Sequence, residues 1–101
     1  MTIKALGPLS ISTESAISSI SASVTSVVLL PASERRSGFV VKNTGASATL
    51  HLALAATAST TTYTISLAAG DAVAFDDGEY CGAVSAVWSA AEGGAVVTEF
   101  K

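Results

Sequence analysis

Short runs in which apolar and polar residues alternate constrain the fold of this chain more than any other feature. Leucine occupies every second position from Leu50 to Leu54, and the segment from Tyr63 to Leu67 alternates in the same way. Successive side chains of a β-strand point to opposite faces, so this pattern is typical of a strand with one buried face. No segment has convincing helical periodicity. The chain is therefore predicted to be all-β.

Such runs recur about every 10–14 residues and end at turn-forming residues, a spacing typical of antiparallel β-proteins. They lie at residues 24–30, 38–43, 48–54, 63–67, 73–75, 83–89 and 95–100. No connection between them is long and periodic enough for the crossover helix that parallel strands need. A chain of 101 residues suits a single domain. We therefore expect roughly six or seven strands in one antiparallel β-sandwich or jelly-roll-like small barrel.

The beginning of the chain has a different composition. Residues 9–26, LSISTESAISSISASVTS, are rich in serine and nearly uncharged. Serine favours strand or coil over helix because its hydroxyl competes for backbone hydrogen bonds. We expect residues 1–23 to form an N-terminal arm that is ordered only where something packs on it. Residues 24–101 are expected to form the β-sandwich domain.

Composition and charge exclude several classes of function. The charged residues make up 13% of the chain and the formal net charge is −3, so a nucleic-acid partner, which needs clustered Lys and Arg, is not expected. The sequence shows neither a signal peptide nor a run of about 20 apolar residues. We therefore expect no membrane partner and synthesis in a cytoplasm. The surface is expected to consist largely of Ser, Thr, Ala and Gly.

The charges are unevenly distributed along the chain. Residues up to Asn43 carry +2 and those beyond it carry −5. Two complementary patches of this kind would steer identical subunits into a head-to-tail ring. The alternative is that the two halves mix in the fold and the asymmetry has no role.

The stretch GFVVKNTGASATLHLAL (residues 38–54) contains both Asn43 and His51. We interpret it as two adjacent antiparallel strands joined by the Asn43-Thr44-Gly45 turn, where Asn and Gly tolerate positive φ. His51 lies on the face opposite the leucines and is expected to be a surface or interface residue. With one His and one Cys, Cys81, a transition-metal site is not expected. No catalytic residue is predicted, and the protein is not expected to be an enzyme.

The acidic segment Asp76, Asp77 and Glu79 is the best candidate for a charged site. Its carboxylates are ligands that Ca²⁺ prefers, but the spacing of an EF-hand loop is absent. A charged β-turn with Gly78 in a left-handed conformation is the ordinary explanation of the run. No metal ion and no cofactor are predicted.

Two further features are candidate interface residues. Arg35 and Arg36 follow Glu34 at a junction between loop and strand, where a guanidinium group can clamp a carboxylate of a neighbouring subunit; a solvated loop is the alternative. Trp88 shares a strand face with other apolar residues, so it serves either the core or an interface as an anchor. The predicted interface residues are Arg35, Arg36, Asp76, Asp77, Glu79 and Trp88.

About two thirds of the chain, from Arg35 onward, resembles small virion proteins of tailed bacteriophages. The pattern runs Arg36-x-Gly38-Phe39-x-Val41-x-Asn43-x-Gly45, then Tyr63-Thr64-x-x-Leu67-Ala68-x-Gly70. It continues as Tyr80-x-Gly82-x-Val84-x-Ala86-x-Trp88-x-Ala90-Ala91, a glycine pair, and Val97-Thr98-Glu99. Proteins with this pattern are β-sandwich or jelly-roll-like modules of phage particles, which include capsid decoration (cement) proteins and components of the fibre base, tail or baseplate.

The resemblance implies a noncatalytic binding role as a homo-oligomer, with a trimer favoured. The expected function is a head decoration protein that stabilises the capsid, with the major capsid protein or other virion proteins as partners and the virion as its location. The alternative is a β-sandwich module of the tail, baseplate or fibre that binds carbohydrate or a receptor. That role would need an exposed aromatic platform, for which Tyr63, Tyr80 and Trp88 are the candidates.

Overall fold

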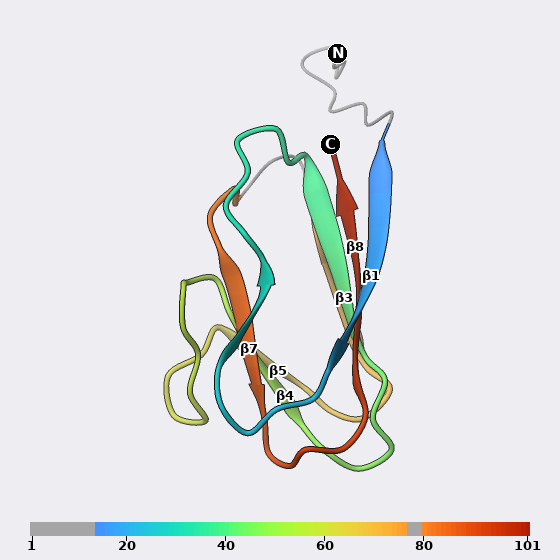
Figure 1. Ribbon diagram of the computed structural model, residues 1–101, viewed down its shortest axis with the longest axis vertical. Helices are drawn as coiled ribbons and strands as arrows, with labels where there is room; N and C mark the ends of the chain where they lie inside the picture. The colour runs from blue at the N-terminus through green and yellow to red at the C-terminus, as the bar shows by residue number, and fades with distance from the viewer. Residues whose placement is uncertain (1–13, 77–79) are drawn as a thin grey trace.

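The computed structural model describes residues 14–76 and 80–101, which form two four-stranded antiparallel sheets packed as a sandwich (Figure 1). Sheet A has the order β1-β8-β3-β6 and sheet B the order β2-β7-β4-β5. The strands are β1 (Ser15–Ser21), β2 (Val27–Leu30), β3 (Gly38–Asn43), β4 (Leu50–Ala53), β5 (Ile65–Leu67), β6 (Ala72–Phe75), β7 (Val84–Trp88) and β8 (Gly94–Phe100). The predicted fold class is confirmed, as a sandwich rather than a closed barrel. Within the described ranges no helix could cross a membrane.

The strand pairing is nested along the chain. The first strand pairs with the last, β2 with β7, β3 with β6 and β4 with β5. This is the connectivity of a jelly roll, in which a long folded-back ribbon is rolled into two sheets. Strands of the basic half therefore lie beside strands of the acidic half. The two halves interleave in the fold, which favours the mixed-charge alternative over two separate patches.

The core lies between the sheets. Phe39, Val41 and Val97 of sheet A meet Leu50 and Leu52 of sheet B. The ring of Phe39 stacks on Phe75 with centroids 5.0 Å apart. Every second residue of β3, β4 and β8 contributes to this layer, as the alternation predicts.

Strand β1 differs from the prediction of an arm. Residues 15–21 pair along their whole length with β8, from Ser15 opposite Phe100 to Ser21 opposite Gly94. The backbone ladder holds this serine-rich segment, and Ile20 packs against the core. The sandwich thus begins before the predicted boundary at residue 24, and residues 1–13 lie outside the described ranges.

The segment between β3 and β4 also differs from the prediction. Strand β3 belongs to sheet A and β4 to sheet B, so the two are not hydrogen-bonded neighbours. The Asn43-Thr44-Gly45 segment carries the chain from one sheet to the other. The described glycines with positive φ are Gly70 and Gly93. A Cβ at Gly93 would overlap the backbone of Gly45, so this position needs glycine for both its φ and the close approach.

Candidate functional site

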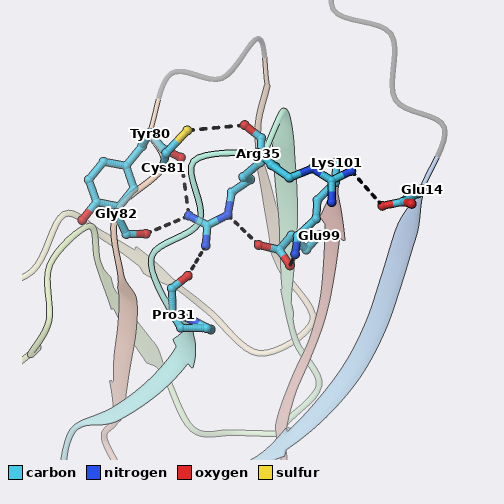
Figure 2. A network of polar contacts seen from close by, with 9 residues as sticks. Glu14, Pro31, Arg35, Tyr80, Cys81, Gly82, Glu99 and Lys101 are labelled. Carbon is cyan, nitrogen blue, oxygen red and sulfur yellow. Dashed lines mark hydrogen bonds and ion pairs between the residues drawn. The ribbon is translucent and has the colours of Figure 1, made fainter.

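The side chain of Arg36 forms the centre of a polar cluster with Pro31, Gly82 and Glu99. Figure 2 shows these three partners facing one cluster. The Arg36 side chain is completely buried, and its Nε donates to Glu99 Oε2 at 2.9 Å. The other guanidinium nitrogens donate to Gly82 O at 2.7 Å and to Pro31 O at 2.5 Å, with Tyr80 O at 3.5 Å. The guanidinium carbon also lies 5.5 Å from the ring centroid of Phe39. The charge is therefore compensated and its donors are largely satisfied within the chain.

Most partners of Arg36 come from distant parts of the sequence. Pro31 follows β2, Gly82 precedes β7 and Glu99 lies in β8, so the cluster joins both sheets at one end of the sandwich. A neighbouring contact holds the segment that precedes β7: the Tyr80 hydroxyl donates to Ala83 O at 2.8 Å. The Cys81 thiol donates to Arg36 O at 3.4 Å. Arg36 therefore acts as an internal clamp, which corrects its prediction as an interface residue.

Arg35 has the opposite environment. Its side chain is 73% exposed and reaches Glu14 Oε1 at 3.5 Å, and the Glu14 side chain is itself 59% exposed. Such a pair contributes little to stability because water screens it. The side chains of the two adjacent arginines thus have opposite environments, because Arg36 points into the sandwich and Arg35 points into solvent.

Asn43 closes the opposite end of the sandwich. Its side chain is fully buried, and Nδ2 donates to Ala48 O at 2.8 Å and to Leu67 O at 3.0 Å. Its Oδ1 accepts from the backbone N–H of Gly45 at 3.1 Å. The amide satisfies backbone groups of the β3–β4 connection and of β5 at once, which explains the residue through its side chain rather than through positive φ.

Glu92 caps the same crossover segment from the β7–β8 connection. Its two carboxylate oxygens accept from the backbone N–H groups of Ala46 at 2.7 Å, Ser47 at 3.1 Å and Ala48 at 2.9 Å. These hydrogen bonds favour the charged form and lower the pKa of Glu92 from 4.5 to about 2, with that from Ala46 the largest cause. Sequence reasoning missed this residue.

The chain covers part of the outer face of sheet B with its own loop, residues 54–64, which Figure 1 shows as the yellow-green coil beside β7. Ser85 Oγ donates to Ala55 O at 2.9 Å, and the N–H of Ala58 donates to Ser26 Oγ at 2.9 Å. Val87 and Ser85 are buried, although neither belongs to the core cluster between the sheets. His51 also points to this side and packs on Tyr63 with ring centroids 4.7 Å apart. His51 is therefore half-buried under the loop.

The outer face of sheet A is open by comparison. Residues that alternate with the core positions of its strands point outward, and the register places them in three rows across the sheet. The first row is Ser15, Phe100 and Gly38, with Asp76, which follows β6, next to Gly38. The second row is Ile17, Thr98, Val40 and Ala74, and the third is Ser19, Val96, Lys42 and Ala72. Ile17 is 72% exposed. We call these twelve positions the outer face of sheet A.

The remaining predicted site residues are separated in the structure. Trp88 is 1% exposed and packs in the core, so its prediction as an interface anchor is corrected in favour of the core alternative. Asp76 is exposed at the edge of the outer face of sheet A. Asp77 and Glu79 lie outside the described residues. Arg35 and Asp76 therefore remain as described candidates on the surface.

A cavity of about 460 Å³ lies at the edge of sheet A, lined by Glu14, Ser15, Ala16, Glu99 and Lys101. Lys101 Nζ lies 3.9 Å from Glu99 Oε1, so two carboxylates and one ammonium group face this opening. Within residues 14–76 and 80–101 no group of three or more His, Cys, Asp or Glu side chains is placed to hold a metal ion.

Comparisons with known proteins assign no family to this chain. Neither the family models, nor the curated proteins, nor the solved structures contain a match to this chain.

Proposed function

We propose that this protein is a structural component of a tailed-phage virion, a head decoration protein that binds as an oligomer to the capsid surface. The observation that carries the proposal is the nested pairing of the eight strands. It is the jelly-roll connectivity used by viral capsid domains, lectin domains and cupins, and the sequence resemblance implies a module of this kind. Because a fold by itself does not determine a function, the jelly-roll connectivity and the resemblance support the proposal together.

The residues of the resemblance pattern support the proposal through their roles. Arg36, Phe39, Val41 and Asn43 are all buried, and two of them clamp the ends of the sandwich. The pattern therefore describes a framework rather than a reactive site. A protein built in this way acts through its surface, and its low content of charged residues suits close packing against other subunits.

The carbohydrate-binding alternative has less support. A glycan site needs aromatic rings that share one exposed surface, but Trp88 is in the core and Tyr63 packs on His51 over sheet B. Tyr80 is half-buried beside the Arg36 cluster, with its hydroxyl bonded to Ala83 O. These three residues do not form a common platform.

The proposal is tested by co-sedimentation of the purified protein with purified heads and, separately, with purified tails of the phage whose genome carries the gene. Binding to heads supports the decoration role, because many copies attached to a lattice gain avidity. Binding to tails alone would move the protein to the tail or baseplate. Binding to glycans without binding to either particle would overturn the proposal.

A further inference from the structure

The outer face of sheet A differs from the rest of the surface in its chemistry. Its middle row, Ile17, Thr98, Val40 and Ala74, carries no charge, and the flanking rows add Phe100 and Val96. Among the described residues at outward positions, Lys42 lies in one flanking row and Asp76 in the other. The loop at residues 54–64 lies over the opposite sheet.

The two charges lie at opposite ends of this face. Gly38, which lies beside Asp76, and Lys42 are both in β3. Four residues of strand separate their rows, which corresponds to about 13 Å. A face with a cation at one end, an anion at the other and uncharged residues between them is complementary to itself after rotation by 180°. The charge pattern therefore fits a second copy of the same face.

We propose that the outer face of sheet A binds a second copy of this chain through a two-fold axis that runs across the strands along the middle row. This operation places Val40 opposite Val40 of the second copy and Ile17 opposite its equivalent. It places Lys42 of each copy beside Asp76 of the other, and Phe100 opposite Val96. Aligned sheets pack about 10 Å apart, a gap that Lys and Asp side chains span from opposite sides.

The area of the outer face of sheet A is smaller than that of a stable interface. Four strands and three rows give a footprint of roughly 300–400 Å² per copy from the spacings of strands and residues. Stable interfaces commonly bury about 800 Å² per partner. The pair is therefore weak and forms at high local concentration, such as that on a crowded particle. A two-fold contact closes at two copies, so the trimer that the resemblance implies needs a different, head-to-tail surface.

This inference concerns the oligomer of the proposed function, and its test uses the protein alone, so that its failure is distinct from a failure to bind heads. Sedimentation equilibrium of the wild-type chain at high concentration should show a reversible monomer–dimer equilibrium. Lys42→Asp and Asp76→Lys should each weaken self-association at least about tenfold, because each places like charges together. Both residues are exposed, so the variants should remain folded, as circular dichroism checks.

The decisive experiment mixes the two single variants. Lys42→Asp and Asp76→Lys should associate with each other, since the mixture restores opposite charges at both ends of the face. The double variant Lys42→Asp/Asp76→Lys should self-associate like wild type. Glu34→Lys is the matched control for Asp76→Lys, because it changes the net charge equally at an exposed loop position and should leave the equilibrium unchanged. A wild-type chain that remains monomeric, a mixture that does not associate, or a control as damaging as the face variants would overturn the inference.

Discussion

At the scale of single residues, the polar side chains of this protein mainly hold its ends together. Arg36 joins two sheets at one end, while Asn43 and Glu92 tie the crossover segment at the other. Each contacts at least one group that is more than 20 residues away in the sequence. Removing such a residue leaves buried polar groups without partners, which costs more than the bond itself contributes.

Arg36→Ala should lower the free energy of unfolding by about 3–5 kcal/mol, because it removes the nearer of the two cations beside Glu99 and the donor to three carbonyl groups. Arg35→Ala is the matched control and should cost about 0–1 kcal/mol, since its ion pair is exposed. Urea denaturation measures both. Similar losses for the two variants would contradict the role of Arg36 as an internal clamp.

The lowered pKa of Glu92 predicts a specific pH dependence of the stability of the fold. This pKa is about 2 in the folded chain, so the charged form of Glu92 stabilises the fold fully above pH 4.5, and this contribution disappears as the pH falls toward 2. Wild type should therefore be more stable than Glu92→Gln at neutral pH, and the difference should shrink between pH 4.5 and 2. Comparing the two proteins removes the effect of other carboxylates. A difference that stays constant over this range would show that the backbone N–H groups do not hold the charge.

At the scale of elements, β1 is an edge strand. One side of its backbone pairs with β8, and no strand of the sheet lies on the other side. Glu14 N–H donates to Lys101 O, Lys101 N–H donates to Glu14 O, and Ala22 N–H donates to Gly93 O. Backbone groups alternate in direction along a strand, so even-numbered residues of β1 bond to β8. The backbone groups of odd-numbered residues point away from the sheet.

Proline substitutions test this alternation. Ser18→Pro removes a ladder hydrogen bond to β8 and should cost about 1–3 kcal/mol through the carbonyl group that is left unpaired. Ser19→Pro, one residue further on, has its N–H on the open edge and should cost clearly less. Thermal denaturation compares the two variants. The reverse order would show that β1 pairs in a different register.

The sequence predicted the strands from β2 onward because their apolar residues alternate or form β-branched runs between turns. It missed β1, since SAISSIS contains few large apolar residues and its stability comes from the ladder with β8. The clamp by Arg36 and the cap by Glu92 could not be read from local patterns, because their partners lie 44–63 residues away for most contacts. For Trp88, the core alternative was already visible in the apolar neighbours on its strand face.

At the scale of the whole molecule, the nested pairing brings the first and last strands together and leaves sheet A with an open outer face. Sheet B carries the loop of residues 54–64 on its own outer face. The molecule thus has two unlike sides. A weak contact on one side suits a protein that works in many copies, because attachment at many points multiplies small affinities.

The most direct test of the proposed function is a titration of purified heads with this protein, with the bound copies counted per major capsid subunit after sedimentation. A decoration protein occupies equivalent sites on the lattice, so binding should saturate at a fixed small ratio and should survive Glu34→Lys, a substitution at an exposed loop position. Arg36→Ala should lose binding in proportion to its loss of folded protein. Folded wild-type protein that leaves the heads bare, or that binds without saturation, would contradict the account.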